Sequence, residues 1–136
     1  MTAPTKPKPL INSTFDRGFW EGVEAGKLLI ARCPETGVYS FPPSACGRSG
    51  GPSPEMVEAS GRGSVYTFVV YHRPYHPAWA AELPYVVAWV MLEEGVIMLA
   101  QLVGVAPATV AIGMEVEVLF DRIGDRSVPR FAPVSA

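Results

Sequence analysis

The sequence predicts a mainly β protein in which an N-terminal helix and a degenerate zinc-ribbon module precede a five-stranded OB-fold barrel. An amphipathic stretch precedes residue 26, two zinc-knuckle-like motifs follow it, and strand-like segments separated by turns fill the chain after residue 60. At 136 residues the chain is long enough for one domain, or for a small module attached to one domain. We therefore divide it into a flexible arm (1–11), a helix-and-ribbon module (12–58) and a barrel (59–136).

The first predicted element is a short helix that starts near residue 12 and ends near Ala25. Ser13 or Thr14 is suited to cap its N-terminus, and Gly26 to end it. Apolar residues recur at helical spacing, which favours a single buried stripe. They are Phe15, Phe19, Trp20 and Val23. Core packing is the preferred interpretation of this stripe, with docking to a partner as the alternative.

Two motifs resemble C-x-x-C-G zinc knuckles from which the second cysteine has been lost. The ligand positions are Cys33, Thr36, Cys46 and Ser49, so a hydroxyl stands where each knuckle needs its second thiolate. Tetrahedral structural zinc requires four good ligands, and neutral hydroxyls bind it poorly. We expect no bound zinc and no catalytic cysteine. Free thiols are favoured over a disulfide, although paired knuckles could bring the two sulfurs close enough to oxidise.

Short strands are expected on either side of the first knuckle, over 27–32 and 38–41, and a Gly-, Ser- and Pro-rich loop over 47–54. The predicted barrel strands are 64–72, 85–92, 96–103, 115–120 and 129–134. In the strand 115–120 the residues alternate between two faces, with Val116, Val118 and Phe120 directed inward. The strands 64–72 and 85–92 are apolar on both faces. Because a small barrel buries one face of its strands, the N-terminal module or another polypeptide should cover the second.

Composition limits the possible partners. The chain is 49% hydrophobic and 18% charged with a mean hydropathy of +0.20, which indicates that some apolar surface meets a partner. Its net charge of -2 and pI near 5.6 argue against nucleic acid, whose binding depends on cationic contacts. No apolar run approaches the roughly 20 residues that span a bilayer, and the N-terminus lacks the apolar core of a signal peptide. We expect a cytoplasmic protein with no membrane partner.

A set of motifs along nearly the whole chain after residue 12 resembles the acyl-CoA-associated OB-fold proteins, long catalogued as a domain of unknown function. The motifs are FWEG (19–22), GKLLIARC (26–33), FPP (41–43), C-G-x-x-G around Cys46, SGRGSVYTF (60–68), HRPYHPAW (72–79), LPYVVAWVMLEEG (83–95), LVGV (102–105), IGMEVEVLF (112–120) and PRFAP (129–133). Members of that family combine an N-terminal helix, a rubredoxin-like zinc ribbon and an OB-fold.

This resemblance implies an accessory subunit of thiolase-like enzymes, including thiolases, acyltransferases and the aldolases of steroid side-chain degradation. The thiolase-fold partner carries the catalytic residues, while the OB-fold subunit stabilises it and helps to enclose the coenzyme A thioester. We therefore expect a hetero-oligomer with no cofactor bound by this chain itself and no catalytic residue of its own. The acyl substrate, the stoichiometry and the choice among thiolytic, retro-aldol and acyl-transfer chemistry stay open.

The segment 72–84 is the strongest candidate for a binding loop. It holds both histidines of the chain and three prolines that stiffen it. An arginine can grip a phosphate, and a tyrosine or tryptophan can stack on adenine. The candidates for facing coenzyme A or the partner are His72, Arg73, Tyr75, His76 and Trp79. Two histidines without a third ligand are weak evidence for a metal, and hydrogen bonding within the loop or packing at an interface is the alternative.

Two other classes of function remain as alternatives. OB-folds and zinc ribbons both bind single-stranded nucleic acid, but every lysine of this chain lies at or before position 27, outside the predicted barrel. A free-standing thioesterase could use His72 or His76 as a base. However, no Ser, His and Asp arrangement at a recognisable spacing supports that alternative.

Overall fold

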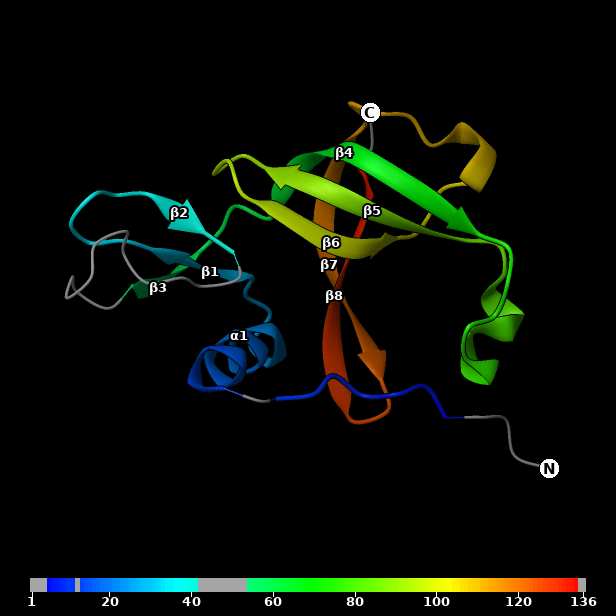
Figure 1. Cartoon of the computed structure of the whole chain (residues 1–136), viewed down its shortest axis with the longest axis horizontal. Helices are drawn as coiled ribbons and strands as arrows, with labels where there is room; N and C mark the ends of the chain where they lie inside the picture. Colours follow the sequence, from blue (N-terminus) through cyan, green and yellow to red (C-terminus); the bar gives the residue numbers. More distant parts are fainter. Residues whose placement is uncertain (1–4, 12, 42–53, 135–136) are drawn as a thin grey trace.

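The computed structural model describes residues 5–11, 13–41 and 54–134, and the side chains of residues 14 and 15 are not described. One helix precedes a small sheet and a closed barrel, as Figure 1 shows. The elements are α1 (Thr14–Glu24), β1 (Leu29–Arg32), β2 (Tyr39–Ser40), β3 (Glu55–Glu58), β4 (Arg62–Tyr71), η1 (Pro77–Glu82), β5 (Tyr85–Leu92), β6 (Ile97–Leu102), η2 (Pro107–Thr109), β7 (Glu115–Ile123) and β8 (Arg126–Pro133). The predicted fold class is confirmed.

Helix α1 begins and ends where its capping residues predict. The Asp16 N–H donates to the Ser13 side chain at 3.1 Å, which satisfies a backbone donor that the first turn leaves unpaired. At the other end Gly26 adopts a φ of +76°, a conformation that side chains other than glycine rarely take. Phe19 and Val23 are buried and Trp20 is half-buried, so the described residues of the apolar stripe pack into the core.

The ribbon module is built around a small antiparallel sheet in the order β2-β1-β3. Strands β1 and β2 match the predicted segments 27–32 and 38–41. Strand β3 was not predicted, because Glu55 and Glu58 bracket only two apolar residues and the segment is too short to show a period. The predicted loop 47–54 and the second knuckle lie almost wholly outside the described residues.

The barrel closes in the order β4-β5-β6-β8-β7, with antiparallel neighbours except for the parallel pair β6 and β8. All five predicted barrel strands are present. The β7–β8 hairpin extends further than predicted, because Asp121, Arg122 and Arg126 resemble turn residues but pair across the two strands. Inside the barrel Val65, Val90 and Phe131 are almost completely buried.

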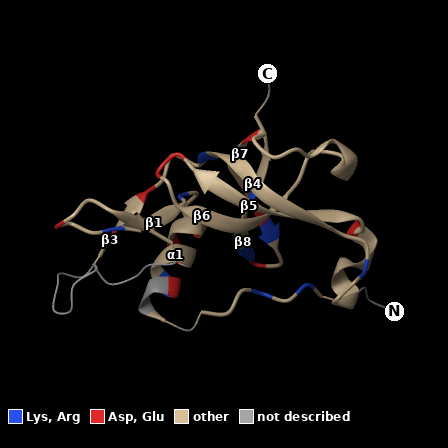
Figure 2. Cartoon of the chain, turned by 45° about the horizontal axis from the view of Figure 1, so that its top comes forward, with Lys and Arg blue, Asp and Glu red and all other residues tan. Residues whose placement is uncertain are grey.

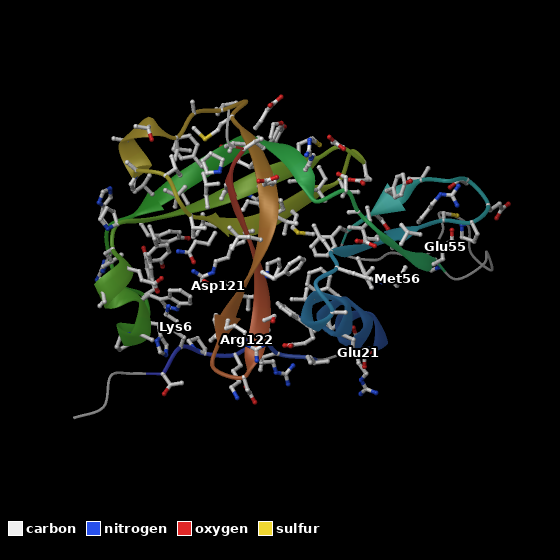
Figure 3. The ribbon with its side chains drawn as sticks, turned by 180° about the vertical axis from the view of Figure 1, so that it is seen from behind. Lys6, Glu21, Glu55, Met56, Asp121 and Arg122 are labelled. Carbon is white, nitrogen blue, oxygen red and sulfur yellow. The ribbon has the colours of Figure 1, made fainter. Side chains whose placement is uncertain are left out.

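The helix fastens the ribbon module to the barrel. Its C-terminal Glu24 accepts a hydrogen bond from the Ser127 N–H at 2.7 Å and pairs with Arg122 at 3.4 Å, so α1 is joined to the β7–β8 hairpin. Figure 3 shows Arg122 on the side of the hairpin that faces α1. Among the described residues, no helix has the length and apolar character required to cross a membrane.

Candidate functional site

The candidate loop connects β4 to β5 and contains η1. The imidazole of His76 caps this short helix, since its Nδ1 accepts a hydrogen bond from the Ala78 N–H at 3.1 Å. His76 therefore has a structural role within the loop, which was the alternative interpretation of the histidines. His72 and Arg73 are exposed, and Tyr75 is 74% exposed, so these side chains project from the barrel.

Aromatic side chains form the base of the loop. Tyr71 at the end of β4 stacks on Tyr85 at the start of β5, with ring centroids 5.0 Å apart. Tyr75 meets Tyr71 edge-on at 5.6 Å, and Trp79 lies 6.0 Å from Tyr85. Burial, with a smaller contribution from neighbouring Tyr71, raises the pKa of the Tyr85 phenol. The cluster gives the loop a rigid apolar base.

A network of charged side chains holds the other side of the loop. Arg130 of β8 has a side chain only 6% exposed, and it lies 3.3 Å from Asp121 and 3.9 Å from Glu82 of η1. Lys6 of the arm pairs with Glu82 at 2.6 Å and lies 4.8 Å above the Trp79 ring. Figure 3 shows Lys6 reaching toward η1 from the arm, with Asp121 above it on the hairpin. The arm, the loop and the β7–β8 hairpin thus share one network.

Ring contacts and a capping hydrogen bond tie Tyr75, His76 and Trp79 to the loop and its base, although Tyr75 is still 74% exposed, whereas His72 and Arg73 project outward. Sequence reasoning missed the residues that hold the loop, because they come from distant segments and carry no local motif. These are Lys6, Tyr71, Glu82, Tyr85, Asp121 and Arg130. The PRFAP motif at 129–133 was a usable signal, since it places an arginine inside a predicted strand.

The first zinc-knuckle motif retains its turn, although a hydroxyl residue, Thr36, occupies one of its two ligand positions. The Gly37 N–H donates to the Cys33 carbonyl at 2.7 Å, and the Cys33 N–H donates to the Val38 carbonyl at 2.9 Å. The Thr36 hydroxyl accepts a hydrogen bond from the Val38 N–H at 3.3 Å. Cys46 and Ser49, the second pair of ligand positions, lie outside the described residues.

Cys33 is disulfide-bonded, and this corrects the expectation of free thiols. A disulfide was the alternative considered above, since paired knuckles can bring two sulfurs within bonding distance. A disulfide sulfur and a neutral hydroxyl do not fit the thiolates of a structural zinc site. No group of three or more His, Cys, Asp or Glu residues suited to a metal occurs among the described residues.

Family models match most of the chain in two consecutive pieces. The model described as the rubredoxin-like zinc ribbon domain of ChsH2 matches residues 20–55. The model described as the C-terminal OB-fold domain of ChsH2 matches residues 56–121. The order of the two models agrees with the order of the observed small sheet and barrel.

Similar proteins fall into two groups. DUF35 domain-containing scaffold proteins are 36% identical in Methanocaldococcus jannaschii, over 76% of this chain and 75% of the relative, and 35% identical in Pyrococcus furiosus, over 85% and 82%. The 3-oxo-4,17-pregnadiene-20-carboxyl-CoA hydratase alpha subunit of Mycobacterium tuberculosis is 40% identical over 85% of this chain. That match covers 36% of the subunit, so the chain spans about a third of its length.

A solved structure, named as the Ltp2-ChsH2(DUF35) aldolase, matches with a TM-score of 0.83 and 37% identity. The match covers 93% of this chain and 98% of the matched chain. A DUF35 protein from Sulfolobus solfataricus matches with a TM-score of 0.61 at 16% identity, which supports the shared fold alone.

Proposed function

The chain belongs to the DUF35 family of zinc-ribbon and OB-fold proteins, and from this premise we propose that it is a noncatalytic subunit of a two-protein acyl-CoA enzyme. The partner is a thiolase-fold subunit that supplies the reacting groups. This chain stabilises the partner and contributes one wall of the site that holds the coenzyme A thioester. The reaction is the formation or cleavage of a carbon–carbon bond beside the thioester carbonyl, as in a thiolase or an aldolase.

The observation that carries this proposal is the match to the ChsH2 component of an aldolase over nearly the full length of both chains. A curated relative named as a 3-oxo-4,17-pregnadiene-20-carboxyl-CoA hydratase alpha subunit supports a CoA thioester as the ligand, although the match covers only about a third of that relative. The candidate loop favours a supporting role over catalysis, because the ring nitrogen Nδ1 of His76 is engaged in capping η1.

The exposed half of the candidate loop is the part that we assign to the ligand. Arg73 and Tyr75 project from a base that the aromatic cluster and Arg130 hold rigid. A guanidinium can bind a phosphate of coenzyme A, and an exposed aromatic ring can pack on its adenine. Because the loop is fixed before the ligand arrives, little ordering entropy opposes binding.

Co-purification from the native cell tests the subunit assignment. A thiolase-fold companion in stable stoichiometric association supports it, and the complex should have an activity on acyl-CoA thioesters that neither protein has alone. Recovery of the chain as a separate protein, together with an active thiolase that lacks it, contradicts the proposal.

Substitution of Arg73 tests the ligand role of the loop. Arg73→Ala should weaken binding of an acyl-CoA thioester to the complex by roughly tenfold to a hundredfold, since a charge-assisted contact to phosphate contributes about 1–3 kcal/mol. Arg17→Ala, which removes an exposed arginine from α1, is the matched control and should bind normally. Calorimetric titration of the assembled complexes gives the affinities, while light scattering monitors assembly. Unchanged affinity in an intact Arg73→Ala complex removes this residue from the ligand site.

A further inference from the structure

The outer face of the β4, β5 and β6 strands exposes an unusual amount of apolar surface. Tyr66 is 56% exposed, Val69 53%, Trp89 44% and Leu99 53%. Trp89 is paired with Thr67 of β4 on one side and with Leu99 of β6 on the other, so the exposed side chains lie across neighbouring strands. We call this surface the sheet face. It comprises Tyr66, Thr67, Val69, Val87, Trp89, Ile97 and Leu99.

The sheet face contains no acidic or basic side chain. Figure 2 shows the central parts of β4, β5 and β6 without Lys, Arg, Asp or Glu, whereas charged residues gather on the turns and on the β7–β8 hairpin. On that hairpin Asp121, Arg122 and Asp125 are exposed. An uncharged surface with Trp and Tyr near its centre has the composition of an interface core rather than that of ordinary protein surface.

The sheet face continues into a groove that separates the barrel from the ribbon module. The groove has a volume of about 710 Å³. Tyr39 and Phe41 line it from the ribbon side, and Tyr66 and Trp89 line it from the barrel. Two modules therefore contribute to one apolar depression, and a molecule seated there contacts both of them.

We propose that the sheet face and its groove form the docking surface for the thiolase-fold subunit, with the groove receiving an apolar side chain or turn of that subunit. This inference rests on the proposed function and names the surface through which the two subunits meet. The occupant is a different protein rather than a second copy, because the structural match is to one component of an enzyme named for two proteins, Ltp2 and ChsH2. Its complementary surface is apolar and uncharged, since a charge facing Trp89 would be desolvated without a partner.

The position of this surface also fits the role of the candidate loop. Strand β4 runs from the sheet face to Tyr71, and β5 starts at Tyr85, so the loop lies at one end of the same two strands. A subunit that covers the sheet face thus has the loop at its edge. The thioester would be held where the loop meets the partner.

The test measures the affinity of the co-purified thiolase-fold subunit for variants of the full chain. Trp89→Thr, Leu99→Thr and Val69→Thr each place a β-branched residue, which suits a strand, and remove exposed apolar surface without opening a core cavity. Leu10→Thr is the matched control, because Leu10 is 78% exposed but lies on the arm. Circular dichroism melting of each free variant confirms that it is folded.

We expect at least a tenfold loss of affinity for Trp89→Thr and Leu99→Thr, a smaller loss for Val69→Thr, and a change of less than twofold for Leu10→Thr. Wild-type affinity in all three strand variants overturns the assignment of the surface while the proposed function stands. A discrete homodimer that Trp89→Thr dissociates, with partner binding intact, identifies a second copy as the occupant and also overturns it. If the wild-type chain binds no thiolase-fold subunit, the proposed function itself fails.

Discussion

Thr36 helps to hold the shape of the first zinc-knuckle motif, in which it occupies a ligand position. Its hydroxyl accepts the Val38 N–H, and the backbone hydrogen bonds between Cys33, Gly37 and Val38 close the turn. Gly37 has a φ of +75°, so the turn also depends on a residue without a side chain. Local hydrogen bonding and a disulfide at Cys33 thus constrain this turn.

The zinc content of the purified protein should reflect the hydroxyl residues at two of the four ligand positions. We expect the purified chain to retain far less than one zinc per molecule after dialysis, because two of the four ligand positions, Thr36 and Ser49, are hydroxyls. The double variant Thr36→Cys and Ser49→Cys, prepared under reducing conditions, should bind about one zinc. Elemental analysis measures both. A full equivalent of zinc in the unmodified chain contradicts this prediction.

Lys6 should influence the environment of Trp79 through a single close contact. Its ammonium group lies 4.8 Å above the indole ring and pairs with Glu82. Lys6→Ala should therefore shift the Trp79 indole N–H resonance and lower the free energy of unfolding by about 0.5–1 kcal/mol. Lys8→Ala is the control, because Lys8 pairs with Asp125 on the hairpin instead. An unchanged Trp79 resonance in Lys6→Ala means that the arm does not hold the loop in solution.

At the scale of elements, the joint between α1 and the β7–β8 hairpin depends on Glu24. An acidic residue in the last turn of a helix is unfavourable for the helix dipole, so its position calls for a compensating interaction. The structure provides one, since the carboxylate accepts the backbone N–H of Ser127, a residue only 7% exposed. Local propensity alone would not place a glutamate there.

Glu24→Ala should lower the free energy of unfolding by about 1–2 kcal/mol, because the Ser127 N–H loses its acceptor. Glu21→Ala on the same helix is the matched control, and it should change stability by less than about 0.5 kcal/mol because Glu21 is exposed. Urea unfolding followed by circular dichroism measures both variants. Equal stability of the two variants would show that the joint contributes nothing.

Helices and strands with a clear hydrophobic pattern or a capping residue were predictable from the sequence. A strand that exists because it pairs with a distant strand was not. The limits of α1 follow from Ser13 and Gly26, and β5 from a continuous apolar run. Strand β3 exists because it pairs with β1 at the register Ile30 to Val57, a relation that no local pattern contains. The loop residues were predicted from their chemistry, but the network around Arg130 joins the arm, η1 and β7, and only the folded chain reveals it.

At the scale of the whole molecule, the apolar second face of β4 and β5 was predicted from composition along the strands. The N-terminal module was one candidate to cover it, and the structure leaves Val69, Trp89 and Leu99 about half exposed. Apolar surface of this kind is normally buried against another protein. The isolated chain therefore carries a surface that its assembly would remove from water.

The isolated chain should consequently self-associate as its concentration rises, and addition of the thiolase-fold subunit should replace these assemblies with a defined complex. The double variant Trp89→Thr and Leu99→Thr should stay monomeric at concentrations where the wild-type chain does not, because it removes the two large side chains that are paired at the centre of the sheet face. Multi-angle light scattering over a concentration series measures both chains. A wild-type chain that remains monomeric throughout the series would mean that the sheet face tolerates water, and that an interface is not needed to explain it.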